Sequence, residues 1–308
     1  MCAMWNPEVV VDEELARGLI GDRLPGFRDA PLRLLGEGWD STVWRAGEEW
    51  LFRFPRREMV VPGFLREVEV LPRLARALPL PVPVAEVRGE PDERFRWPWA
   101  GFRILPGREL VEVAADAEAR ARYGRGLGQF LRALHDIDPA TVTAGGELLP
   151  VDAVRRADMP FRVARTGEQL GRLADLGLWR PPPGFAAVME DARSLPEPDE
   201  LVLCHGDLHL RHLLVSAAGE LAGVIDWIDV CRADACLDLL LYWGYLDAGG
   251  REAFLAEYGP VDDVRMLRAR VITVSIWGAL AEYADAVGME RLGRVALAGL
   301  DLATADLV

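Results

Sequence analysis

Short runs of alternating hydrophobic and polar residues fill the first third of the chain. Alternation with many β-branched and aromatic side chains is typical of strands that bury one face. Between the second and third runs, the sequence Ala-Gly-Glu-Glu predicts a hairpin turn. The runs that we interpret as strands are residues 32–36, 41–46, 49–55, 82–87 and 99–105.

Two helices accompany these strands. The first begins near Asp12, whose side chain can cap it, and ends by Gly21. The second covers residues 64–78, where apolar residues recur at helical spacing. Pro72 falls inside it, so a kink or a break is expected there. A turn at Pro106-Gly107 then marks the end of the amino-terminal part.

Helical periodicity replaces the alternation after this turn. Residues 116–137 form a long amphipathic helix with Asp116 as its N-cap, and the chain from about residue 234 predicts three or four more helices. Three strand-like runs lie between them and predict a small hairpin, at 201–204, 212–215 and 220–226. The order predicts an α+β fold with two lobes, β-rich at 1–105 and mostly helical at 106–308, rather than repeated βαβ units.

The composition excludes several classes of protein. The 308 residues are 51% hydrophobic, yet no apolar run reaches the ~18–20 residues of a membrane span. The first residues are acidic and lack a signal-peptide core, so we expect a cytoplasmic protein without membrane association. The formal net charge of −14 argues against a nucleic-acid partner and is compatible with a cationic small molecule.

Cysteine and lysine usage narrows the chemistry. Cys2, Cys204, Cys231 and Cys236 form no CxxC pair, so we expect free buried thiols rather than disulfides or a zinc site. All 35 residues in the combined lysine and arginine count are arginine. A Walker-type lysine, a pyridoxal Schiff base and a Ser–Lys dyad are therefore excluded. Any side-chain cation that grips a phosphate must be arginine.

Three of the four histidines fall in one stretch, LVLCHGDLHLRHLLV at 201–215. On a helix, the spacing of His205, His209 and His212 would place all three on one face, as in a zinc site. The strand-like flanks predict a loop instead. Asp207 in this loop, His212, and Asp226 at the end of the next strand would suit Mg²⁺-assisted phosphoryl transfer, in which one aspartate orients an acceptor hydroxyl and the other groups hold the metal.

Two features of the amino-terminal part fit the same chemistry. Gly36 and Gly38 lie between two strands, where they would let the backbone approach a phosphate, and Ser41 could add a hydroxyl. Arg53 lies on the opposite strand face from its phenylalanine neighbours, either paired with a carboxylate or on an open surface. Glu67 on the following helix is the candidate partner, with Glu69 as the alternative.

HGDLHLRHLLV at 205–215 followed by GVIDWIDVCRADACLDLL at 223–240 resembles the paired signature of the aminoglycoside phosphotransferase family. Upstream segments match in the same order, namely GWDS, FRFPRR, REVEVLPRL, ILPG and FLRALH. The resemblance covers roughly residues 30–300 and implies the two-lobed protein-kinase-like fold.

The resemblance also implies roles for individual residues. Asp207 would accept or orient the proton of the substrate hydroxyl, and Asp226 would bind Mg²⁺. Arg53 stands in place of the family's strand lysine, with Glu67 as its partner. The backbone of residues 103–105 (Arg103, Ile104 and Leu105) would hold the nucleotide base.

Two departures from the family pattern occur. His212 stands where the family generally has a metal-binding asparagine, and imidazole suits Mg²⁺ less well than an amide oxygen. Macrolide-phosphorylating members of the family also carry histidine there. Asp234-Ala235 lacks an expected proline, while Asp238 keeps the position that braces the loop.

The resulting hypothesis is a kinase that moves the γ-phosphate of ATP or GTP to a hydroxyl of an aminoglycoside, a macrolide or a related metabolite. The protein would be a monomer or a homodimer. A choline-, homoserine- or sugar-kinase-like role and a non-catalytic nucleotide-binding protein are the alternatives. Carboxylates chosen by location for a cationic acceptor are Asp229, Glu257, Glu282 and Asp285.

Overall fold

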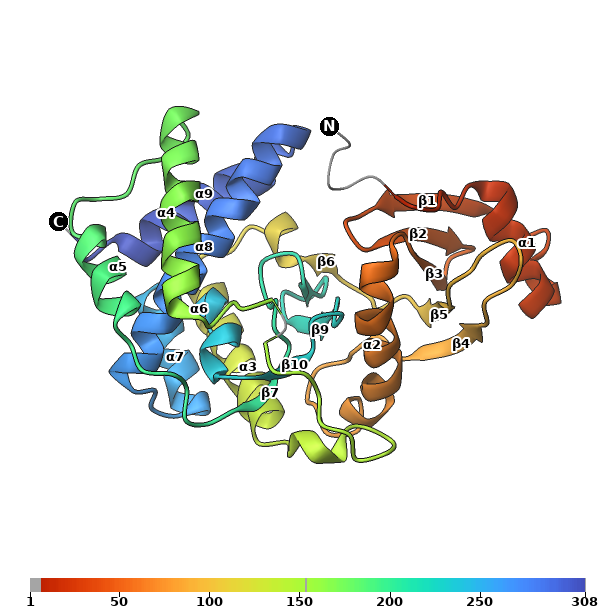
Figure 1. The fold of residues 1–308 in the computed structure, drawn as a ribbon, viewed down its shortest axis with the longest axis horizontal. Coiled ribbons are helices and arrows are strands. Elements are labelled where there is room, and N and C mark those ends of the chain that lie inside the picture. The colour runs from red at the N-terminus through yellow and green to blue at the C-terminus, as the bar shows by residue number, and fades with distance from the viewer. Residues whose placement is uncertain (1–6, 153, 308) are drawn as a thin grey trace. The chain divides into compact units, whose positions relative to one another are not determined.

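A five-stranded antiparallel sheet, in the order β1-β2-β3-β5-β4, occupies the amino-terminal part (Figure 1). The predicted hairpin is present, with Ser41 opposite Pro55 and Ala46 opposite Trp50. The fourth strand begins later than predicted because Pro81 and Pro83 cannot donate the hydrogen bonds that pairing needs. The strands are β1 Leu32–Glu37, β2 Ser41–Ala46, β3 Trp50–Pro55, β4 Ala85–Gly89 and β5 Trp99–Arg103.

Two α-helices accompany the sheet. α1 (Glu13–Arg23) is capped as predicted, since the Asp12 carboxylate accepts from the Leu15 N–H at 2.9 Å. α2 (Val61–Leu74) contains Pro72 in its last turn and ends well before the predicted residue 78. Because Pro72 has no N–H, the Val68 carbonyl lacks its helical donor, and the Arg88 guanidinium donates to it instead at 3.0 Å.

The core of this part is aromatic. Phe52 and Phe54 on β3 are fully buried, and the Phe54 ring stacks on Trp99 with centroids 5.3 Å apart. Strand alternation then directs Arg53, between them, to the other face.

The computed structural model describes residues 7–152 and 154–307. They divide into two compact units, one of residues up to Arg76 with Pro81–Leu105 and one of Ala77–Leu80 with the residues from Pro106 onward. The second unit is mostly helical, which confirms the predicted α+β class. Its helices are α3 Ala117–His135, α4 Met159–Asp175, α5 Phe185–Arg193, α6 Leu240–Gly244, α7 Ala248–Tyr258, α8 Asp263–Val287 and α9 Glu290–Thr304.

Short strands hold the loops of the second unit. The predicted hairpin is formed by β8 (Leu213–Val215) and β9 (Leu221–Val224), and β6 (Arg108–Glu109) joins β8 on its other side. β7 (Val202–Cys204) pairs with β10 (Cys231–Ala233).

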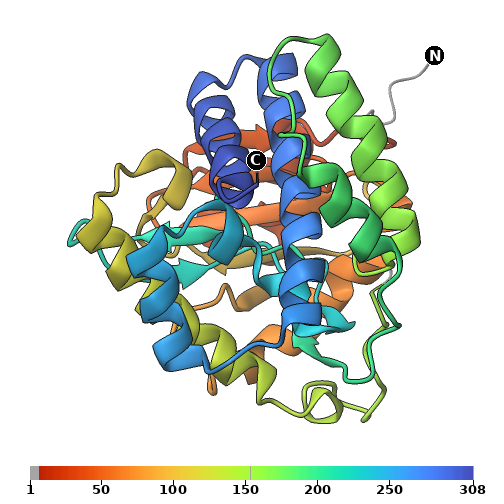
Figure 2. The same cartoon turned by 90° about the vertical axis from the view of Figure 1, so that its left-hand side faces the viewer.

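Glycines allow close helix packing in this unit, where α8 lies between α4 and α9 (Figure 2). A Cβ atom on Gly299 of α9 would lie 2.1 Å from Nε1 of Trp277 and 2.5 Å from the Gly244 carbonyl oxygen. Only glycine fits at this contact between α9, α8 and the end of α6.

The three described cysteines, Cys204, Cys231 and Cys236, are free and buried, as predicted. Cys2 lies outside the described residues.

Over residues 7–152 and 154–307, no helix combines the length and the apolar character that a membrane crossing requires.

Candidate active site

The histidine-rich stretch forms a loop between β7 and β8, as the flanking strands predicted. A helical zinc face is therefore absent from these residues. The rings nevertheless gather, because His212 stacks on His209 with centroids 3.8 Å apart. Burial and the neighbouring His212 hold the pKa of His209 well below its ordinary value.

Asp238 anchors the start of this loop. Its two carboxylate oxygens accept the backbone N–H groups of His205 at 2.8 Å and Gly206 at 2.9 Å. His135 on α3 lies 3.2 Å from the same carboxylate. Burial alone would raise the pKa of Asp238, but the hydrogen bond and charge of His135 and the N–H of Gly206 outweigh burial and lower it. Asp238 thus takes the bracing position that the family resemblance implied.

His205 connects the loop to the end of β9. Since a carbonyl only accepts, Nε2–H of His205 donates to the Ile225 oxygen at 3.0 Å, and Nδ1 accepts the Asp207 N–H at 3.2 Å. The ring is fully buried, and burial lowers its pKa, so it stays neutral. Its neighbour Gly206 has φ +87°, and a Cβ atom there would lie 2.5 Å from the Asp229 carbonyl oxygen. These contacts fix the backbone on both sides of Asp207.

Sequence reasoning missed the cation that faces Asp207. Nη2 of Arg156 lies 3.1 Å from Oδ1 of Asp207 and 2.8 Å from Oδ2 of Asp229. Burial disfavours the charged form of Arg156, but these two carboxylates outweigh burial and raise its pKa above the ordinary value. Arg156 precedes α4 in a segment without a motif, and no local signal separates it from the other arginines of the chain.

His212 and Asp226 form a candidate metal site. His212 donates Nδ1–H to the Asp207 carbonyl at 2.8 Å, which leaves the lone pair on Nε2. This Nε2 lies 3.3 Å from Oδ2 of Asp226, whose backbone is left-handed with φ +66°. A nitrogen lone pair and a carboxylate at this distance repel each other unless a proton or a cation lies between them. A proton on Nε2 satisfies the pair, and a divalent cation bound by both groups would take its place.

The Asp207 loop carries a second group of side chains that could bind a metal. Ligand atoms of Asp207, His209 and His212 all lie within 4.8 Å of one another. Carboxylates are the preferred protein ligands of Mg²⁺, whereas imidazole is more typical of transition metals.

The carboxylates predicted for the acceptor do not form one cluster. Asp229 pairs with Arg156, and Glu282 on α8 pairs with Arg172 of α4 at 2.7 Å. Glu257 lies on α7, 3.9 Å from Arg125 of α3, and Asp285 is an exposed residue near the end of α8. Among the described contacts, neither Glu257 nor Asp285 meets Asp207 or Asp229.

In the first unit, the expected ion pair between β3 and α2 is present. Nη1 of Arg53 lies 2.7 Å from Oε1 of Glu67. The Arg53 side chain is only 14% exposed and that of Glu67 is fully buried, so Arg53 is not on an open surface.

The glycine-containing loop between β1 and β2 is held by the two arginines that follow β3. Arg56 donates to the Gly38 carbonyl at 2.7 Å, and Arg57 donates to the Trp39 carbonyl at 3.0 Å. A Cβ atom on Gly36 would meet no atom within 4 Å, so packing within the protein does not demand glycine there. The hydroxyl of Ser41 is buried and makes no hydrogen bond among the described residues.

The segment after β5 offers fewer donors for a nucleotide base than predicted. The Ile104 N–H already donates to the Glu49 carbonyl at 2.8 Å, and the Arg103 side chain pairs with Glu49 and Glu86. Of the backbone N–H groups predicted to bind the base, that of Leu105 has no acceptor among the described residues.

Solved structures of small-molecule kinases share this fold. The GDP and kanamycin complex of APH(2")-IIia superimposes with a TM-score of 0.69 at 20% identity, over 94% of this chain and 98% of that one. The apoenzyme of macrolide 2'-phosphotransferase MphH from Brachybacterium faecium gives 0.63 at 24% identity, over 92% and 98% of the two chains. These likenesses confirm the kinase-like arrangement of a β-sheet region followed by a helical region.

Sequence comparisons give the family. The uncharacterized protein YcbJ of Bacillus subtilis (strain 168) is 26% identical over 205 residues, which span 64% of this chain and 63% of that relative. Residues 31–269 match the profile of the phosphotransferase enzyme family, abbreviated APH. The match includes the glycine loop, Arg53, the loop of Asp207 and Asp226. The chain belongs to this phosphotransferase enzyme family.

Proposed function

We propose that the protein transfers the γ-phosphoryl group of ATP or GTP to a hydroxyl of a small molecule. The observation that carries this proposal is the fixed loop around Asp207. Its carboxylate is presented by a backbone that His205, Asp238 and Gly206 hold in place. Phosphoryl transfer depends mainly on positioning and charge, so a rigid carboxylate that receives the hydroxyl proton suits the reaction.

Arg156 and Asp207 would act together on the acceptor. Arg156 orients the Asp207 carboxylate through Oδ1, which leaves Oδ2 available to accept the proton of the hydroxyl. His209 Nε2, 3.6 Å from Oδ2, faces the same oxygen as a neutral ring.

Asp226 and His212 are the proposed metal ligands, and a ligand atom of Asp207 lies within 4.8 Å of one of His212. Bound Mg²⁺ would neutralise charge on the transferring phosphates. The tautomer of His212, fixed by the Asp207 carbonyl, presents Nε2 for this purpose.

The first unit would supply the nucleotide-binding residues. Arg53, oriented by Glu67, takes the phosphate-binding role in this lysine-free chain. Gly36 opens space for a phosphate next to the loop backbone, and the buried Ser41 hydroxyl is a further donor. The Gly38 carbonyl accepts a hydrogen bond from Arg56, which holds the loop in place. Leu105 offers a backbone N–H to the base.

Charge at the Asp207 loop favours an acceptor with little positive charge. Arg156 already neutralises much of the field of Asp207 and Asp229, and Arg172 does the same for Glu282. A polycationic aminoglycoside gains most from unpaired carboxylates, whereas a macrolide or an amino alcohol needs fewer. We therefore place a macrolide-like or metabolite acceptor ahead of an aminoglycoside. A cytoplasmic location, where ATP and GTP are available, fits this function.

Thermal unfolding with and without Mg-ATP or Mg-GTP tests nucleotide binding first. A phosphorylation screen over macrolides, amino alcohols, sugars and aminoglycosides then tests transfer. We expect a nucleotide-dependent rise in Tm and turnover of at least one hydroxyl acceptor. A rise in Tm without any turnover would instead support the non-catalytic alternative. The absence of both a rise in Tm and turnover would exclude the kinase and the non-catalytic nucleotide-binding protein alike.

A further inference from the structure

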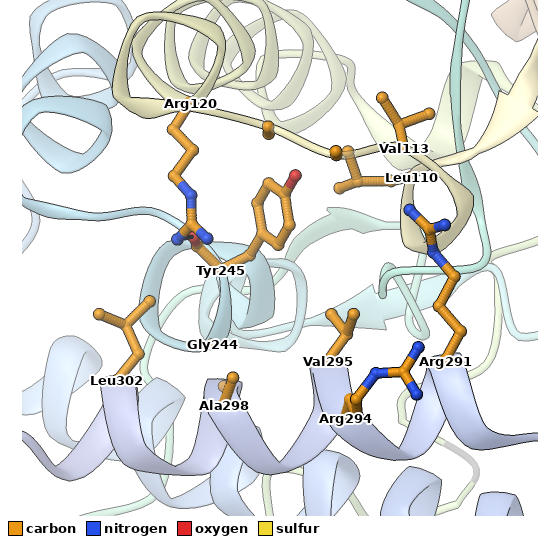
Figure 3. Close-up of a pocket in the computed structure, with 13 residues that line it drawn as sticks. Leu110, Val113, Arg120, Gly244, Tyr245, Arg291, Arg294, Val295, Ala298 and Leu302 are labelled. Carbon is orange, nitrogen blue, oxygen red and sulfur yellow. Dashed lines mark hydrogen bonds between the residues drawn. The ribbon is translucent and has the colours of Figure 1, made fainter.

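A cavity of about 410 Å³ lies in the second unit, away from the residues assigned above. One wall is a face of α9. The other runs from the short 3-10 helix η3 (Leu110–Glu112) to the first turn of α3 (Figure 3). Its volume is within the ~300–1,000 Å³ that small-molecule sites span. None of its lining residues belongs to the proposed catalytic, metal or nucleotide site.

The charge of this cavity is opposite to that of the protein. Arg120, Arg291 and Arg294 line it, and no aspartate or glutamate does, although the chain carries a formal net charge of −14. Figure 3 shows Arg120 on α3 and the two other arginines on α9 around the same space. A concave site with cations on its walls attracts anions.

Two of the guanidinium groups are held in place by neutral partners. Arg120 donates to the Tyr245 carbonyl at 2.7 Å and lies over the Tyr245 ring, 5.0 Å from its centroid. Arg291 donates Nε–H to the Val111 carbonyl at 2.7 Å. Over residues 7–152 and 154–307, no carboxylate lies within ion-pair distance of Arg120 or Arg291. Arg294 pairs with Glu290 at 3.5 Å, and both side chains of that pair are exposed. Since arginine carries five N–H donors, each group keeps donors for a ligand.

The rest of the lining is apolar. Leu110 and Val113 face the α9 side chains across the cavity, and the Tyr245 ring lies between Arg120 and Leu110 (Figure 3). A hydrated inorganic ion would leave these surfaces in contact with water. An anion with an apolar body would cover them as well.

We propose that this cavity binds a small organic anion, with its acidic group at Arg291 and Arg294 and an aromatic or aliphatic body along α9 toward Tyr245 and Arg120. The site is independent of the proposed phosphoryl transfer. Its cationic lining selects an anion, whereas the Asp207 loop presents carboxylates to the acceptor.

The test uses 2-naphthoate as the probe, with 2-naphthylmethanol as its neutral match, in calorimetric titrations of the full chain. We expect naphthoate to bind with a Kd below about 1 mM and at least about tenfold more tightly than the alcohol. Added NaCl should weaken naphthoate binding because the attraction is electrostatic. Equal binding of both probes, or no naphthoate binding, would overturn the proposal.

Variants locate the binding to the cavity. Ala298→Phe fills it from an exposed helical position, and Arg291→Gln combined with Arg294→Gln removes charge; both should weaken naphthoate binding about tenfold or more. Arg165→Gln is the matched control, because Arg165 is an exposed helical arginine in a loose pair with Glu168 outside the cavity. Unchanged binding in Ala298→Phe, or an equal loss in Arg165→Gln, would contradict the site. A cooperative thermal unfolding transition with a Tm near that of the parent protein, retained in all variants, shows that they fold.

Discussion

Asp207 and Arg156 are 51 residues apart in the chain, yet the Arg156 guanidinium donates to the Asp207 carboxylate at 3.1 Å. Asp207 could be predicted because its neighbours in the chain form a motif with fixed spacing. Arg156 could not, because a side chain that arrives from a distant loop leaves no periodic or compositional pattern. The partner of Asp229 could not be predicted either. Sequence reasoning assigned Asp229 to a cationic acceptor, but its carboxylate pairs with Arg156.

Arg156→Met should destabilise the second unit. The change leaves Asp207 and Asp229 facing each other without a cation, and loss of one partner of a buried pair costs ~3–5 kcal/mol. We expect the lower end, because the two aspartates are 20% and 28% exposed. Urea unfolding at pH 7 measures the loss, and Arg156→Lys should restore part of it. Equal stability of Arg156→Met and the parent protein would refute the bridging role.

Among the elements, those with strong local patterns were predictable. Alternation located most of the sheet, and side-chain caps located the starts of α1 and α3. The two errors have a common cause, because proline delayed β4 and ended α2 early. α4 and α5 were not placed individually. Contacts between elements, such as that between Gly299 and Trp277, have no signature in a single sequence.

The loop between β7 and β8 should depend on Gly206. Alanine there would need φ +87° and would place Cβ 2.5 Å from the Asp229 carbonyl oxygen. Gly219→Ala is the control, since Gly219 has φ +79° but its nearest contact would be 3.7 Å away. We expect a loss of about 1–2 kcal/mol for Gly219→Ala, from the left-handed backbone alone. Gly206→Ala should lose more and should also lose turnover. Equal losses would show that the close approach to Asp229 is unimportant.

Asp238→Asn should remove a pH-dependent part of the stability. The pKa of Asp238 is lowered in the folded state, so its carboxylate stabilises the fold above the ordinary carboxyl pKa of about 4. That contribution is lost as the pH falls through the lower folded-state pKa. The difference in free energy of unfolding between parent and variant should be about 1–3 kcal/mol at pH 7 and should shrink below about pH 4. Asp285→Asn, at an exposed position, should show neither effect. A difference that grows on acidification would contradict the assignment.

For the molecule as a whole, the absence of lysine gives a direct test of Arg53. An ATP acyl phosphate transfers its acyl group to a lysine near the phosphates. The parent protein should therefore show no labelling that free ATP suppresses. Arg53→Lys should gain such labelling, because the new amine would replace the guanidinium that Glu67 orients. If Arg53→Lys is not labelled, or if free ATP does not suppress its labelling, Arg53 does not lie at the phosphate site.

The most direct test of phosphoryl transfer by this chain is the turnover of Asp207→Asn with a radiolabelled γ-phosphate donor and the acceptor found by the screen. Asparagine keeps the size of the side chain but cannot accept the hydroxyl proton. We predict that turnover falls by ~10²–10⁴ while the Tm shift with Mg-nucleotide is unchanged. Turnover of Asp207→Asn close to that of the parent protein would contradict the central role of Asp207.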